Sequence, residues 1–215
     1  YLEDIEIDYD SEEEIENNYG IANNMSYHYE DIANNMPYLG YQCEIEDFQD
    51  YTWQITNWTS LERRTTGPEF EAGGWKWRIL LFPCGNNNPK AVSIYLDFAD
   101  KKEAPAGWHC CVQFALALWN PEYPKFCVVH YAYHRFTAEE SDWGFTQFYE
   151  QNKLFVPSKI RPRLLIENNT CNITAFVRII NDPKYLNAEL QLLYSIKYFR
   201  KAIYQIPTED DEPIR

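Results

Sequence analysis

The chain has 215 residues, enough for one good-sized domain with flanking segments. Its net charge of −14 lies in residues 1–50, which hold 15 of the 33 acids and no Lys or Arg; the remaining 18 acids meet 19 bases, a net charge of +1. The sequence has no basic stripe that would attract nucleic acid and no run of about 18 apolar residues that would span a membrane. Aromatic residues make up 17% of the chain, which favours a folded, β-rich interior.

Residues 1–48 predict a disordered acidic tail, because low hydrophobicity combined with charge of one sign disfavours a packed core. One pentapeptide, Ile-Ala-Asn-Asn-Met, occurs twice in this tail, at residues 21–25 and 32–36, and a small residue and a tyrosine follow each copy. Two copies are too few for a repeat architecture. We interpret them as a local duplication; the alternative is a short interaction motif presented twice.

The pattern changes over residues 49–183, where short runs of apolar or alternating residues are separated by Gly, Pro and Asn. Many short strands at this spacing predict a mainly β protein, folded as an antiparallel β-sandwich. The predicted strands are Thr52–Trp58, Trp75–Phe82, Ala91–Phe98, Trp108–Leu118, Phe126–Phe136, Arg163–Ile166 and Asn172–Ile180.

A helical period follows the sandwich, over residues 184–204. Apolar residues recur there at steps of three and four, which predicts an α-helix with one apolar stripe. The stripe consists of Leu186, Leu190, Leu193, Ile196, Phe199 and Ile203. Such a stripe needs a surface to pack against, and the sandwich offers no obvious one.

The six cysteines are expected to be buried free thiols, because most lie in apolar strand-like runs and the chain is longer than small disulfide scaffolds. Their even number leaves a disulfide framework as the alternative. The spacing of Cys127 and His130 formally suits zinc. Cys110 and Cys111, however, are adjacent and would point to opposite sides of a strand, so no metal and no other cofactor is expected.

The segment Asp142-Trp143-Gly144-Phe145 is the most informative motif, because an acid, a large ring and a glycine in a row predict a tight turn that presents an aromatic edge. Together with Tyr51-Thr52-Trp53, Trp58 and Trp75-Lys76-Trp77, it resembles the MATH (TRAF-like) domain family. Within that family the resemblance is to the domains at the head of herpesvirus-associated ubiquitin-specific proteases and their fungal relatives. It implies an eight-stranded antiparallel sandwich, in agreement with the strand pattern.

The resemblance also implies a site. Asp142, Trp143 and Gly144 match the wall of a shallow groove that binds peptides with a Pro/Ala-x-x-Ser core by strand addition. The Asp is expected to accept a hydrogen bond from the peptide Ser, the Trp to pack on a small peptide residue, and the Gly to let the backbones approach. Tyr95 matches an aromatic residue of the opposite wall, whereas a basic residue usual in the family is replaced by Cys84. The alternative is a structural turn whose Trp fills the core.

The segment Tyr185–Gln191 is similar to the start of a ubiquitin-specific protease catalytic domain, in which a nucleophilic cysteine precedes the tyrosine. Here Lys184 stands at that position. The resemblance therefore implies a chain that stops early in such a domain and lacks its catalytic cysteine. An ammonium group cannot replace an activated thiolate in this chemistry, so no catalysis is expected from the chain as given.

The leading hypothesis is a binding module that recruits peptides of partner proteins in the ubiquitin and deubiquitination pathway. The second hypothesis is the N-terminal portion of an active ubiquitin-specific cysteine protease. A trimeric receptor adaptor is disfavoured, because residues 1–48 show no heptads that would form a coiled coil. The resemblance implies a nuclear and cytoplasmic location, and the sequence leaves the oligomeric state open.

Overall fold

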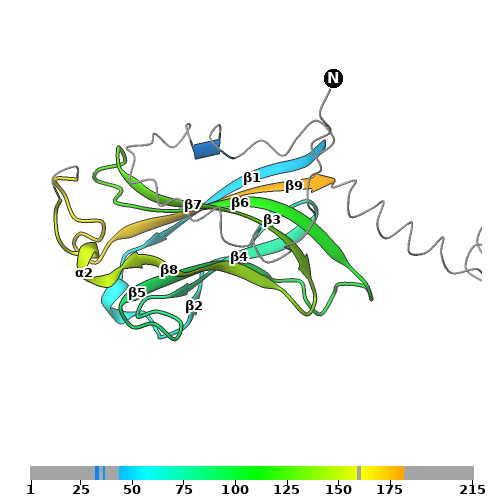
Figure 1. Cartoon of the computed structure of the whole chain (residues 1–215), viewed down its shortest axis with the longest axis horizontal. Helices are drawn as coiled ribbons and strands as arrows, with labels where there is room; N and C mark the ends of the chain where they lie inside the picture. Colours follow the sequence, from blue (N-terminus) through cyan, green and yellow to red (C-terminus); the bar gives the residue numbers. More distant parts are fainter. Residues whose placement is uncertain (1–31, 34–35, 37–43, 159–160, 182–215) are drawn as a thin grey trace, which may run out of the picture.

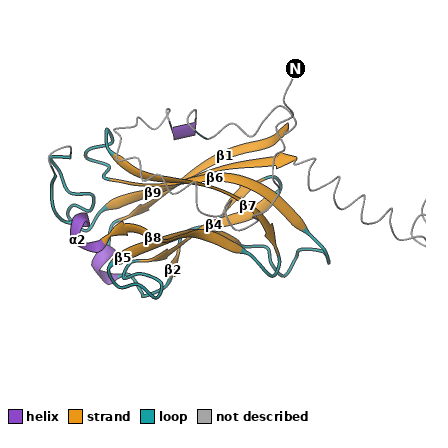
Figure 2. Ribbon diagram, in the orientation of Figure 1, coloured by secondary structure: helices purple, strands orange, loops and turns teal. Residues whose placement is uncertain are grey.

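The structure is a computed structural model that describes residues 32–33, 36, 44–158 and 161–181. Strands joined by loops make up most of this part of the chain (Figure 2). The elements are β1 (Glu44–Ile55), a 3-10 turn (Trp58–Ser60), β2 (Thr65–Thr66), β3 (Phe70–Ala72), β4 (Trp75–Phe82), β5 (Ala91–Phe98), β6 (His109–Trp119), β7 (Cys127–Thr137), β8 (Asp142–Glu150), the helix α2 (Gln151–Leu154) and β9 (Cys171–Asn181).

Two antiparallel sheets pack face to face, which confirms the predicted sandwich (Figure 1). One sheet has the strand order β1-β9-β6-β7, and the other has the order β2-β4-β5-β8 with β3 also paired to β4. Because β2 and β3 pair with opposite ends of β4, they form one interrupted edge, and counting them as one gives the eight strands expected. Pro68, which has no N–H to donate, lies in the interruption.

The core lies between the sheets and is rich in aromatic side chains. Trp77 is fully buried and its indole Nε1 donates a hydrogen bond to the carbonyl of Ala72 at 3.0 Å. Phe98 stacks on Trp108 with ring centroids 3.8 Å apart. The buried polar end of Trp77 is thus satisfied, which is the usual requirement for burying such a residue.

The strand predicted at Arg163–Ile166 is absent; this segment is irregular. Leu165 and Ile166 are buried, and both of their backbone N–H groups donate to the carbonyl of Leu154, at 3.0 and 3.3 Å. Their apolar character therefore reflects a loop that seals one end of the core. Pattern alone cannot separate such a segment from a short strand.

Two further boundaries differ from the sequence-based prediction. Residues 142–144 are not a turn; they are the first three residues of β8. The first strand begins at Glu44, eight residues before the predicted start at Thr52 and within the segment assigned to the tail. The Asp and Glu residues of this segment are compatible with a strand because β1 is the edge of its sheet and its outer positions face solvent.

The cysteines within the described residues are free thiols, and four of the five are buried. Burial raises the pKa of Cys110 and of Cys171 to about 12. None of the helices in the described part of the chain is long and apolar enough to cross a membrane. The helix predicted over residues 184–204 and the position of Lys184 lie outside the described residues.

Candidate functional site

The four predicted site residues lie together on β5 and β8. In the register of these strands, Tyr95 lies opposite Gly144 and Asp97 lies opposite Asp142, with Trp143 between them opposite Leu96. Strand β8 is the outer strand of its sheet, since β5 is its only hydrogen-bonded neighbour in the described sheet order. The site is therefore a sheet edge, which is where another chain can pair.

The backbone of β8 presents its peptide groups alternately to β5 and away from it. The N–H of Phe98 donates to the carbonyl of Ser141 at 2.7 Å, which makes these two a hydrogen-bonded pair. Because such pairs alternate along an antiparallel ladder, Trp143 and Phe145 also direct their peptide groups to β5. The peptide groups of Asp142 and Gly144 consequently face outward, away from the sheet.

Gly144 is required by the close approach of β8 to β5. A Cβ at this position would lie 2.3 Å from the carbonyl oxygen of Ile94 and 2.5 Å from the Cα of Tyr95. Both are backbone atoms of β5 and cannot move aside as a flexible side chain would. The resemblance suggested that this glycine admits a peptide, whereas the contact that constrains it in the structure is with β5.

Trp143 lies at the open side of the sandwich and does not fill the core. Its ring stacks on that of His134 of β7, with centroids 4.1 Å apart and planes 4° apart. The residue remains 37% exposed, which makes it one of the few large apolar residues at the surface among those described. The stack joins the edge strand of one sheet to the edge strand of the other and leaves part of the indole accessible.

Two histidines of β7 hold β8 in place from the other sheet. The Nε2 of His130 lies 2.9 Å from the carbonyl oxygen of Phe148, so the neutral ring can donate this hydrogen bond. Burial lowers the pKa of His130, and the hydrogen bond to Phe148 opposes that change. Burial also lowers the pKa of His134, against smaller opposing effects of Glu140 and Asp142; its Nε2 is 4.0 Å from the Glu140 carboxylate. The surroundings of both imidazole rings therefore favour the neutral form over the protonated form.

Tyr95 supports the site from β5. Its hydroxyl lies 3.0 Å from the Thr146 Oγ1 on β8 and accepts a hydrogen bond from the side chain of Asn86 at 3.2 Å. Its ring meets Phe82 edge-on. Only 9% of the residue is exposed. In this structure Tyr95 braces the loop after β4 against β8, and a direct contact with a peptide stays a prediction.

Cys84, the position at which the resemblance implies a basic residue, is exposed at the start of that loop. The loop is tied to the site through Ser93, whose hydroxyl accepts the N–H of Asn86 at 2.8 Å and donates to the carbonyl of Thr146 at 2.6 Å. These hydrogen bonds hold the backbone of the loop, and with it position 84, close to β5 and β8.

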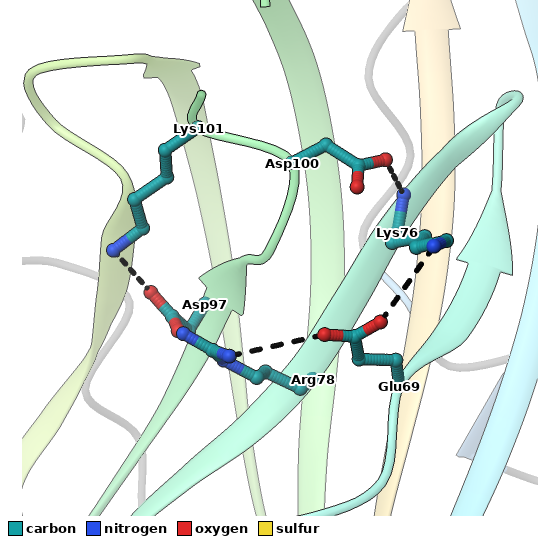
Figure 3. Close-up of polar contacts among 6 residues, drawn as sticks. All are labelled: Glu69, Lys76, Arg78, Asp97, Asp100 and Lys101. Atoms are coloured by element: carbon teal, nitrogen blue, oxygen red, sulfur yellow. Dashed lines mark hydrogen bonds and ion pairs between the residues drawn. The ribbon is translucent and has the colours of Figure 1, made fainter. Parts of the chain in front are cut away.

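Charged residues beside Asp142 were not singled out from the sequence. Asp97 is fully buried and pairs with Arg78 Nε at 2.6 Å and with Lys101 Nζ at 2.8 Å (Figure 3). Arg78 also approaches Glu69, at 3.9 Å. The sequence did contain a signal for these pairs: Asp97 is an acid within the largely apolar run of β5, and a charge in a buried strand needs a partner of opposite charge. These two cations face the carboxylate of Asp97, and Asp142 lies beside it on the next strand.

The described residues show no cluster of three or more side chains suited to a metal ion. The candidate zinc pair is also divided by the sheet. Cys127 pairs with Trp119 and His130 pairs with Leu116, positions whose side chains lie on opposite faces of β6.

A model of the family described as MATH domain matches residues 50–177. The chain is 33% identical over 222 residues to "Ubiquitin carboxyl-terminal hydrolase 15" of Saccharomyces cerevisiae, covering 85% of the chain and 18% of that protein. It is 38% identical over 183 residues to "Ubiquitin C-terminal hydrolase 12" of Arabidopsis thaliana, covering 76% and 16%. It is 35% identical over 108 residues to "TNF receptor-associated factor homolog 1a" of Arabidopsis thaliana, covering 50% and 10%. The chain thus spans less than a fifth of the length of these relatives.

Substitution of Gly144 by alanine is expected to destabilise the domain, because the new methyl group meets the rigid backbone of β5. Overpacking of this kind costs roughly 1–3 kcal/mol, and a contact with backbone favours the upper end. Chemical denaturation would measure the loss. Gln147→Ala, at an exposed position of the same strand, is the control and should change the free energy of unfolding by less than about 0.5 kcal/mol. Equal stability of the two variants would contradict the close approach.

Stability is expected to fall as the pH drops below about 6.5, the usual pKa of histidine. His130 and His134 have lowered pKa values in the folded state, so below pH 6.5 the unfolded chain binds more protons. Each group can contribute a slope of at most about 1.4 kcal/mol per pH unit. Denaturation curves between pH 7.5 and 5 would test this. The difference in slope between the wild type and His134→Gln isolates the contribution of His134. Identical profiles for the two proteins would contradict the lowered pKa of His134.

Proposed function

The chain belongs to the MATH domain family, and we propose that it is a peptide-binding module whose site is the edge strand β8. The observation that carries the proposal is the outward-facing backbone of Asp142 and Gly144 beside the exposed ring of Trp143. A peptide in extended conformation would pair with this backbone and add a strand to the sheet. Main-chain pairing supplies affinity, and the side chains beside the edge supply specificity.

The peptide class follows from the groups at this edge together with the family resemblance. We propose a Pro/Ala-x-x-Ser core, in which the Ser hydroxyl donates a hydrogen bond to the carboxylate of Asp142. As the resemblance implies, the exposed face of Trp143 would pack on a small apolar residue of the peptide. The exposed Cys84 supplies no charge-assisted hydrogen bond to the peptide. The absence of such a bond makes the free energy of binding less favourable by roughly 1.5–3 kcal/mol. We therefore expect affinity in about the micromolar range.

The biological role follows from the relatives. Two of the relatives described above are named ubiquitin hydrolases, and the chain matches less than a fifth of the length of each. We propose that the module recruits substrate or partner proteins for deubiquitination. A nuclear and cytoplasmic location stays a prediction.

Fluorescence polarisation with a labelled Pro/Ala-x-x-Ser peptide tests the binding site. Trp143→Ala is expected to weaken binding at least tenfold, or by about 1.4 kcal/mol, because it removes the one large apolar surface at the edge. Phe155→Ala is the matched control, since Phe155 is also exposed but lies beyond β8, and it should leave the affinity unchanged. Cys84→Arg should strengthen binding by about tenfold through a charge-assisted hydrogen bond. Equal binding by Trp143→Ala and Phe155→Ala would overturn the proposal.

The alternative function is that of an active ubiquitin-specific cysteine protease of which this chain is the N-terminal portion, and it is favoured by the names of the relatives. We propose that this chain itself does not hydrolyse ubiquitin conjugates. An active thiol protease needs a thiolate, and burial raises the pKa of Cys110 and Cys171 to about 12. The resemblance places Lys184 where the nucleophile would stand.

A ubiquitin C-terminal vinyl sulfone should therefore form no adduct with this chain. Iodoacetamide, which should label the exposed Cys84, serves as the control for an intact thiol. Formation of a ubiquitin adduct would overturn the proposal and support the protease alternative.

A further inference from the structure

The sandwich has a second candidate site, on the outer face of the sheet β1-β9-β6-β7. Ala115 and Ala117 of β6 alternate with core residues and so point away from the core. Val129 and Phe176 lie beside them, opposite Ala117 and Ala115 respectively on the neighbouring strands. We call this surface the outer apolar face; it consists of Ala115, Ala117, Cys127, Val129 and Phe176.

The outer apolar face is covered by part of the tail. Ile32 and Met36 are 2% and 5% exposed and belong to the same buried cluster as the face, with Ala33 packed against it. Figure 1 shows this short segment, in blue, lying over the outer side of the sheet and away from β8. Leaving such a patch uncovered would expose contiguous apolar surface, which soluble proteins avoid.

Polar contacts fix the backbone of the covering segment. The guanidinium of Arg178 donates through Nη2 to the carbonyl of Ala33 at 3.2 Å and through Nη1 to Gln113 Oε1 at 2.9 Å. The N–H of Met36 donates to the same carbonyl of Ala33 at 3.4 Å. The carbonyl of Ala33 thus accepts a hydrogen bond from the sheet, while Ile32 and Met36 are buried against the outer apolar face.

The covering residues are the first, second and fifth of the repeated pentapeptide. The copy at residues 21–25 has the same three residues: Ile21, Ala22 and Met25. Each residue type that makes a described contact in the second copy is therefore also present in the first. One chain carries two ligands of equal sequence and one outer apolar face.

We propose that the outer apolar face is a binding site for the Ile-Ala-Asn-Asn-Met motif, and that the two copies in the tail compete for it. The copy at residues 32–36 occupies the face in the structure, and the occupant that replaces it is the copy at residues 21–25. The site is independent of the β8 edge, because it lies on the other sheet and uses side chains of a different kind. The duplication, interpreted from sequence as local, then has a function as a pair of exchangeable ligands.

Methionine methyl NMR of the full chain tests this directly, because Met25 and Met36 are the only two methionines. In the wild type, the Met36 methyl signal should be displaced from the free-methionine position by the ring of Phe176, while Met25 lies near that position. Ile32→Ser removes one anchor of the second copy. It should return the Met36 signal to the free position and move the Met25 signal to the displaced one. Ile21→Ser is the matched control and should leave Met36 docked.

An added unlabelled peptide of residues 19–27 should likewise release Met36, whereas the same peptide carrying Ile21→Ser should not. The shifts should not depend on protein concentration, because both copies belong to the same chain. The proposal is overturned if Met36 is not displaced in the wild type. It is also overturned if Met25 stays at the free position in Ile32→Ser, if the peptide leaves Met36 in place, or if dilution alone moves the signals.

Discussion

The backbones of β8 and β5 approach each other so closely at Gly144 that no side chain fits between them. A Cβ at this position would lie 2.3 Å from the carbonyl oxygen of Ile94. This contact sets how β8 lies on the sheet, and the alternation of an antiparallel ladder then decides which peptide groups face outward. The same register directs Trp143 toward the other sheet, where the ring of His134 meets it. The close approach at Gly144 and the register of β8 on β5 thus place an outer strand edge beside the partly exposed ring of Trp143.

The two sheets present different kinds of surface. The edge at β8 offers main-chain hydrogen bonds, which suit extended peptides of varied sequence. The outer apolar face offers small side chains flanked by larger ones, and Arg178 adds a single donor for a carbonyl. A surface of that kind is suited to bind apolar side chains at a fixed spacing, and each copy of the Ile-Ala-x-x-Met pattern has such a spacing. Because the two surfaces lie on different sheets, the proposed peptide site at β8 and the tail segment on the outer apolar face do not overlap.

Short runs of apolar or alternating residues bounded by turn residues were enough to predict β4 and β5 with the bounds that the structure shows. Strand β8 was missed because Trp143 and Gly144 are typical of a turn when read locally, and only pairing with β5 makes them extended. The resemblance grouped Asp142, Trp143, Gly144 and Tyr95, and the structure places these residues on the paired strands β8 and β5; their role in binding a peptide stays a prediction. The steric need for a glycine at position 144 and the stack of Trp143 on His134 both come from contacts between segments that are distant in sequence. A local sequence pattern does not contain such contacts. The same holds for Asp97, whose partners Arg78 and Lys101 are brought together by folding.

Amide hydrogen exchange along β8, with and without a saturating Pro/Ala-x-x-Ser peptide, is the most direct measurement of strand addition at this edge. Strand addition predicts slower exchange at the outward-facing amides of Asp142 and Gly144. The amides of Trp143 and Phe145, already bonded to β5, should change little. Uniform slowing of all four amides, or protection confined to the sheet β1-β9-β6-β7, would contradict peptide pairing at β8.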